Sequence, residues 1–130
     1  MLTIRVSPMG AVRMTRRGKF TNESAQRYLR YKDDIGYQIK GIVEVPATKA
    51  VGVNAIFYMP IPESWSQKKK KAAVGQYVTK KPDVDNLVKG LFDAANGILW
   101  ADDNLVAKCS AVKIYSDDPR IEIEYGELIS

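Results

Sequence analysis

Histidine is absent from this chain of 130 residues, and cysteine occurs once, at Cys109. Without histidine, Ser-His-Asp and Cys-His nucleophilic chemistry, His-ligated zinc and a histidine general base are all excluded. A single cysteine excludes an intrachain disulfide, and no apolar run reaches the length of a membrane span or of a signal-peptide core. We therefore expect a soluble cytoplasmic protein without a membrane partner, in which any enzymatic base or nucleophile is metal-bound water.

Charge is divided unevenly along the chain. Residues 1–82 hold 16 Lys and Arg against 5 Asp and Glu, a formal net charge of +11. Residues 83–130 hold 4 Lys and Arg against 10 Asp and Glu, a formal net charge of −6. Lys and Arg can gather a polyanion around an acidic pocket whose repulsion a metal offsets. This division is typical of a phosphodiester-cleaving enzyme. The length and the 45% hydrophobic content predict one globular domain over 1–130.

Hydrophobic periodicity predicts a mixture of strands and helices. Strands are predicted at 2–6, 51–58, 105–114 and 120–125, and helices from Thr21 or Asn22 to Ile39, from Ser64 or Ser66 to Val74, and from Asp85 or Asn86 to Asn96. The strand at 51–58 is expected at the centre of the sheet. The last two strands are expected to pair through a turn at 116–119. Cys109 is expected to be a buried thiol.

Four carboxylates flank the third predicted helix. Asp83 and Asp85 precede it, where an extended backbone would project both side chains to the same side, and Asp102 and Asp103 follow it. If the chain doubles back after this helix, Asp103 approaches Asp85. Carboxylate oxygens are the ligands that Mg²⁺ prefers. The alternative is that Asp85 caps the helix and that the other three form ordinary turns.

Lysines and arginines supply the candidate groups for phosphate contact. Lys89 lies one helical turn from both Asp85 and Asp93, which fits either a surface ion pair worth about 0.3–0.5 kcal/mol or a cation that stabilises charge on a phosphorane. The other candidates for DNA binding are Arg13, Arg16, Arg17 and Lys19 in a basic loop, and Lys68, Lys69, Lys70 and Lys71 in the short second helix. The second set fits a solvated helix face equally well.

Between residues 81 and 113 the chain resembles the RusA family of Holliday junction resolvases. The resemblance rests on the ordered motifs Pro82-Asp83-x-Asp85-Asn86-Leu87-x-Lys89, Asp93-Ala94, Asn96-Gly97, Asp102-Asp103 and Lys113. A basic loop after the first strand and the stretch Ser64-Trp65-Ser66-x-Lys68-Lys69 are weaker signals. The ordered set is far more specific than Asp-x-Asp alone.

The resemblance implies roles for these residues and a fold. Asp83, Asp85 and Asp103 match the family's catalytic Mg²⁺ ligands, Asp102 matches the acidic residue before the last ligand, and Lys89 matches the catalytic lysine. Lys113 matches a basic position for which we expect phosphate contact. The implied protein is a small homodimeric α+β domain with a mixed sheet packed against helices. It would use Mg²⁺, with Mn²⁺ as a substitute and no organic cofactor, to resolve four-way DNA junctions by paired symmetric cuts.

Two other interpretations remain open. The first is a metal-dependent nuclease for another branched substrate, such as flaps, replication forks or structured RNA. The second is a noncatalytic nucleic-acid-binding domain whose acidic residues serve as caps and turns, with salt-dependent binding and no Mg²⁺-dependent product.

Overall fold

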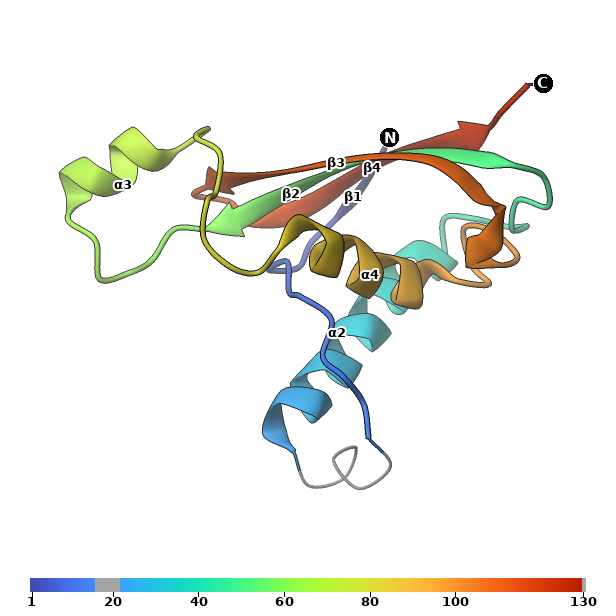
Figure 1. Ribbon diagram of the computed structural model, residues 1–130, viewed down its shortest axis with the longest axis horizontal. Helices are drawn as coiled ribbons and strands as arrows, with labels where there is room; N and C mark the ends of the chain where they lie inside the picture. The colour runs from blue at the N-terminus through green and yellow to red at the C-terminus, as the bar shows by residue number, and fades with distance from the viewer. Residues whose placement is uncertain (16–21, 130) are drawn as a thin grey trace.

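The computed structural model describes residues 1–15 and 22–129, which form an α+β fold. Its mixed sheet has the strand order β1-β4-β2-β3, formed by β1 (Leu2–Ile4), β4 (Arg120–Glu127), β2 (Val51–Pro60) and β3 (Val106–Ser116). The helices are α2 (Glu23–Lys40), α3 (Gln67–Ala73) and α4 (Val84–Ala95), and the 3-10 turn η1 (Asp103–Leu105) precedes β3. Figure 1 shows α2 and α4 on the same side of the sheet and α3 beyond one end. The predicted α+β class with a mixed sheet is confirmed.

Strand β2 lies inside the sheet, as its β-branched and aromatic composition predicts. It pairs with β3 in parallel and with β4 in antiparallel orientation. Every second side chain of β2 is buried against the helices: Val51, Val53, Ala55, Phe57 and Met59. The residues between them lie on the other face, where Asn54 is exposed and Ile56 is half-buried. Apolar residues on both faces of β2 therefore reflect its interior place, with helices on one face only in the described part of the chain.

The last two strands do not pair with each other, so that prediction is wrong. β2 lies between them, because Ser116 at the end of β3 is opposite Pro60, and Arg120 at the start of β4 is opposite Tyr58. The short turn at 117–119 therefore crosses the end of β2. Short connections usually join neighbouring strands, and sequence periodicity does not show which strand fills the space between two others.

Capping contacts confirm the predicted starts of α2 and α3. The Asn22 side chain accepts hydrogen bonds from the backbone N–H groups of Ser24 and Ala25, at 2.9 and 3.2 Å. The Ser66 hydroxyl oxygen accepts one from the N–H of Lys69 at 3.2 Å. Gly97 has a positive φ of 79° immediately after the last turn of α4, a conformation that glycine adopts at little cost.

The expected burial of Cys109 is wrong. Cys109 is exposed, because β3 is the edge strand and its first half, residues 107–110, is exposed on both sides. The core lies instead between the sheet and the helices, and its largest fully buried side chains include Trp100, Tyr28 and Phe57. None of the helices in the described ranges is long and apolar enough to cross a lipid bilayer.

Candidate active site

Helix α4 begins earlier than its sequence predicts, which changes the geometry of Asp83 and Asp85. Asp83 is the N-cap residue, with extended φ and ψ of −66° and 149°, and Asp85 already lies in the first turn. The carbonyl oxygen of Asp83 accepts from the N–H groups of Asn86 and Leu87, both at 3.1 Å. The sequence predicts both carboxylates on one extended segment before the helix. In the structure Asp83 lies at the helix start and Asp85 lies inside the first turn, so this prediction is wrong.

Neither carboxylate is used as a side-chain cap. Asp83 occupies the cap position but its side chain makes no capping hydrogen bond, and Oδ1 of Asp85 accepts only the adjacent N–H of Asn86, at 2.9 Å. Both residues are exposed. Within the residues that the structure describes, neither forms an ion pair with a lysine or arginine. The positive end of the helix dipole favours negative charge at this position, and their free oxygens are available to a cation.

The segment after β1 packs directly against the start of α4. Asn86 and Ala11 exchange two hydrogen bonds of 3.1 Å, one backbone to backbone and one from the Asn86 side-chain amide to the Ala11 carbonyl. A Cβ added at Gly10 would lie 2.9 Å from Nδ2 of Asn86, and one added at Gly90 would lie 3.3 Å from the carbonyl oxygen of Met9. Glycine at position 10 leaves room for the Asn86 side chain, and glycine at position 90 allows α4 to approach the backbone of Met9.

Two hollows flank Asn86 along this contact. One of about 510 Å³ is lined by Pro8, Met9, Gly10, Lys81, Pro82, Asp83 and Asn86. The other, of about 390 Å³, is lined by residues 11–14 and by Tyr28, Lys32, Asn86, Lys89 and Asp93. The first hollow contains a candidate ligand and the second contains Lys89. Arg13, Lys32, Lys81 and Lys89 give both hollows positive charge, as a groove for a phosphodiester strand requires.

Lys89 forms its ion pair with Asp93, not with Asp85. Its Nζ donates to Oδ2 of Asp93 at 3.2 Å, and the hydroxyl of Tyr28 donates to the same oxygen at 2.9 Å. Burial raises the pKa of Tyr28, and the hydrogen bond to Asp93 raises it further, so the hydroxyl keeps its proton. Asp93 therefore joins α2 to α4 and holds the ammonium group of Lys89 beside the second hollow.

Asp103 is held by the turn that follows α4. Its backbone N–H donates to Oδ1 of Asn96 at 2.8 Å, and the indole N–H of Trp100 donates to its Oδ1 at 2.7 Å. Burial is the main cause that raises the pKa of Asp103; the Trp100 hydrogen bond lowers it, the charges of Asp93 and Asp102 raise it and that of Lys89 lowers it. The contacts of Asp103 are thus with Asn96 and Trp100, at the C-terminal end of α4.

In the part of the chain that it describes, the structure therefore does not bring Asp103 together with Asp83 and Asp85. The two caps of α4, Asp83 and Asn96, are separated by about 20 Å at 1.5 Å per residue. Asp103 lies at the Asn96 end. Among the described residues no group of three or more acidic, cysteine or histidine side chains converges as a metal site. The donor chemistry fits Mg²⁺, since every candidate ligand is a carboxylate, while one chain does not gather three of them at one point.

Lys113 and Asp102 already have structural partners. The ammonium of Lys113 donates to the carbonyl oxygens of Lys80 and Pro82, at 2.6 and 2.8 Å, and so fixes the segment that leads into Asp83. Two of the three N–H groups of Lys113 are thereby used. Oδ1 of Asp102 accepts the N–H of Asn104 at 3.1 Å and caps η1.

The basic candidates for DNA binding lie at two places. Arg13 is exposed at the second hollow, whereas Arg16, Arg17 and Lys19 fall outside the described residues. Lysines 68–71 belong to α3, which extends past the end of the sheet (Figure 1). Lys69 and Lys80 both lie over the ring of Trp65, at 4.1 and 5.2 Å from its centroid. A cation that stacks on an aromatic ring keeps its charge and loses some freedom of movement.

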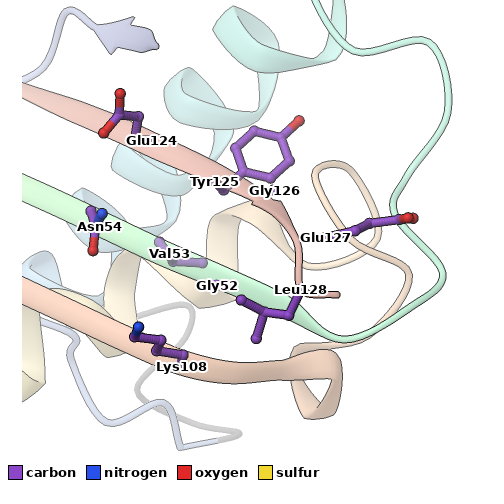
Figure 2. A pocket seen from close by; sticks show the side chains of 9 residues that line it. All are labelled: Gly52, Val53, Asn54, Lys108, Glu124, Tyr125, Gly126, Glu127 and Leu128. Atoms are coloured by element: carbon purple, nitrogen blue, oxygen red, sulfur yellow. The ribbon is translucent and has the colours of Figure 1, made fainter. Parts of the chain in front are cut away.

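A further hollow lies on the open face of the sheet, away from the four candidate carboxylates Asp83, Asp85, Asp102 and Asp103. Its volume is about 310 Å³. Figure 2 shows β3, β2 and β4 side by side at this hollow, with Lys108, Asn54 and Glu124 on the three strands. Ser110 donates to Oδ1 of Asn54 at 2.6 Å next to it. The lining contains none of the candidate ligands and not Lys89, so this hollow is no part of the candidate active site.

Four residues of this site had no role assigned from the sequence: Tyr28, Asp93, Asn96 and Trp100. Asp93 and Asn96 lie within the family motif and on the polar strip of α4, which is a signal that they face something polar. Tyr28 and Trp100 carry no such signal. Each has an apolar ring that fits the periodicity of core residues, and each is fully buried with its polar atom hydrogen-bonded to a carboxylate.

Comparison with known proteins relates this arrangement to a nuclease family. The family model for Endodeoxyribonuclease RusA matches residues 4–125. The chain belongs to the RusA family of endodeoxyribonucleases. It is also 38% identical over 89 residues to YqaN of Bacillus subtilis (strain 168), an uncharacterized protein; the match covers 65% of this chain and 63% of that protein. The chain thus spans less than two thirds of this relative's length. All of the candidate ligands lie inside the range that the RusA family model matches.

Proposed function

We propose that this RusA family protein is a Mg²⁺-dependent endodeoxyribonuclease that resolves four-way DNA junctions by paired symmetric cuts. The observation that supports this most is the membership of the family together with exposed, unpaired carboxylates at the start of α4. The proposed ligands of one or two Mg²⁺ ions, or of Mn²⁺ in their place, are Asp83 and Asp85 at the start of α4 and Asp103, assisted by Asp102, beyond its other end. In the described residues one protomer does not bring Asp103 to the other two. The bound ion would lower the pKa of a water molecule and neutralise charge on the phosphate.

The chain's own residues would bind and orient the phosphodiester. Lys89, held by Asp93, supplies a positive charge beside the second hollow, which stabilises the additional negative charge of a pentacoordinate phosphate. Arg13 and Lys32 lie along the same hollow and can contact neighbouring phosphates. Lys113 contributes indirectly, because it fixes the segment before Asp83.

The proposed working form is a homodimer on branched DNA. A four-way junction has two equivalent strands to cut, and a dimer with twofold symmetry presents two identical sites to them. Helix α3, which carries Lys68, Lys69, Lys70 and Lys71, extends beyond one end of the sheet (Figure 1), and its lysines are suited to follow the phosphates of one junction arm. Binding of this kind is strongly dependent on salt.

The test compares the wild-type protein with the Asp85→Asn and Asp33→Asn variants on four end-labelled substrates: a four-way junction, a flap, a replication fork and a linear duplex. Each substrate is incubated in Mg²⁺ and in EDTA. Asp33 is an exposed carboxylate on α2 and serves as the matched control. We expect the wild type and Asp33→Asn to make Mg²⁺-dependent symmetric nicks in the junction alone, and Asp85→Asn to bind the junction without cutting. Nicking by Asp85→Asn would refute the metal assignment. Faster cutting of flaps or forks than of the four-way junction would identify the protein as a nuclease for another branched substrate. Tight binding without any cutting would indicate a noncatalytic binding domain.

A further inference from the structure

Trp100 is a buried hydrogen-bond donor whose polar atom faces a candidate metal ligand. Its side chain is 0% exposed, and edge contacts with Phe92 and Tyr125 hold the ring, at centroid distances of 5.2 and 6.0 Å. A buried indole N–H needs an acceptor, and here the acceptor is Oδ1 of Asp103 at 2.7 Å. Because the acceptor is a carboxylate, the bond is stronger than one between neutral groups.

The backbone of Asp103 is fixed by the same turn. Gly97 donates its N–H to the carbonyl oxygen of Trp100 at 2.8 Å, and the N–H of Asp103 donates to the Asn96 side chain at 2.8 Å. Asp103 is therefore held at its backbone N–H and at one carboxylate oxygen, Oδ1. Its other oxygen, Oδ2, has no hydrogen-bond or ion-pair partner among residues 1–15 and 22–129.

We infer that Trp100 is a positioning residue for Asp103: its buried indole N–H holds Oδ1 so that Oδ2 is presented to a divalent cation. The inference rests on the proposed function, because that function makes Asp103 a ligand. Groups that hydrogen-bond a metal ligand fix its orientation, and their loss typically lowers metal affinity about 10- to 100-fold. A purely structural Trp100 would stabilise the turn without any effect on metal binding.

The first test observes the indole N–H signals by ¹⁵N–¹H correlation spectroscopy of the whole chain, with and without Mg²⁺. The chain has two tryptophans, so Trp65 supplies an internal control, and a Trp65→Phe variant assigns the two signals. We expect Mg²⁺ to move the Trp100 signal in a saturable manner, to leave Trp65 in place, and to move nothing in Asp103→Asn. A Trp100 signal that stays in place at saturating Mg²⁺ would overturn the inference, whatever a cleavage assay shows.

The second test separates positioning from stability with two variants of the same aromatic cluster. Trp100→Phe removes the donor and keeps a ring, whereas Phe92→Leu loosens the packing around Trp100 and keeps the donor. Both should lower Tm. We expect the Mg²⁺ concentration at half-maximal cleavage to rise about tenfold or more in Trp100→Phe alone. An equal Mg²⁺ requirement in both variants would overturn the inference.

The two proposals fail in distinguishable ways. If Mg²⁺ moves the Trp100 signal but the protein cuts no junction, the positioning of a cation ligand is supported and the proposed reaction is wrong. If the protein cuts junctions in Mg²⁺ while the Trp100 signal stays in place, the proposed reaction is supported and the role of Trp100 is wrong.

Discussion

The hydroxyl of Tyr28 donates a hydrogen bond of 2.9 Å to Oδ2 of Asp93, across 65 positions of sequence. This bond joins the middle of α2 to the polar strip of α4, and the same oxygen accepts from Lys89. Lys32 lies over the Tyr28 ring at 4.7 Å from its centroid. Helix α4, which carries Lys89, is thus joined to α2 through the carboxylate of Asp93.

We predict that Tyr28→Phe destabilises the protein by about 1–2 kcal/mol. The variant keeps the buried ring and removes one hydrogen bond to a partly buried charged acceptor. Urea denaturation measures the difference. Tyr37→Phe is the matched control, because its side chain lies on the same helix and is 86% exposed. Equal stability of the two variants would show that the Tyr28 hydroxyl contributes nothing measurable.

Lys113→Met should release the segment that leads into Asp83. The variant removes a charged donor from two backbone carbonyls, at a cost of about 1–3 kcal/mol. We expect a lower Tm and faster trypsin cleavage after Lys80, measured by mass spectrometry of the fragments. Lys108→Met, an exposed lysine on the same strand, should change neither. A Lys113→Met protein with wild-type Tm and cleavage pattern would show that Lys113 does not fix the segment before Asp83, and would leave phosphate contact as its role.

Asp103→Asn should raise the Tm at pH 7 in EDTA by a few degrees. Burial, the largest cause, raises the folded-state pKa of Asp103 above 3.8, so the folded protein holds this proton more tightly than the unfolded chain does. Its stabilising contribution is complete below pH 3.8 and is lost as pH rises through the folded-state pKa. The ionised carboxylate is therefore a cost at neutral pH.

The amide oxygen of Asp103→Asn still accepts from Trp100, so the comparison isolates the charge. Thermal unfolding followed at pH 7 and again near pH 3.8 checks the prediction. The advantage of the variant should shrink between the two conditions. An advantage of the same size at both pH values would assign the effect to packing.

Replacement of all four lysines of α3 by glutamine should weaken binding to junction and duplex alike. Each phosphate contact that is lost reduces the slope of log K against log salt by about 0.9, so two to four contacts reduce it by about 2–4. Fluorescence anisotropy at several salt concentrations measures the slope. A variant with glutamine at Lys40 and Lys49, two exposed lysines elsewhere, is the control. An unchanged slope of log K against log salt concentration would show that the α3 lysines make no phosphate contacts and are only solvated.

Much of the fold follows from local sequence signals. The predicted caps Asn22 and Ser66 are confirmed, because a cap is determined by residues within one turn of the helix end. The interior place of β2 follows from its composition. The order of β3 and β4 does not, since it depends on which distant segment enters the sheet between them. The exposure of Cys109 follows from that order, because an edge strand has little cover.

The candidate site could be predicted by residue type but not by arrangement. Asp83, Asp85 and Lys89 stand out because they belong to an ordered motif that resembles the RusA family. The pairing of Lys89 with Asp93, and not with Asp85, depends on the hydroxyl of Tyr28, which arrives from another helix. The Trp100 contact is invisible to periodicity for a similar reason. An indole fits a core position regardless of where its N–H points.

The parallel pairing of β2 with β3 also determines when the molecule can take shape during synthesis. Ser110 meets Asn54 across 56 positions of sequence, and the lysines of α3 and all four candidate carboxylates lie in the chain between those two residues. Closing so long a loop costs entropy that only the finished pairing returns. After β2 has been synthesised, the ribosome must therefore add the whole segment between β2 and β3 before these two strands can pair. The nascent protein reaches the end of β3 before its acidic and basic segments are fixed, so the capacity to act on DNA should emerge late in translation.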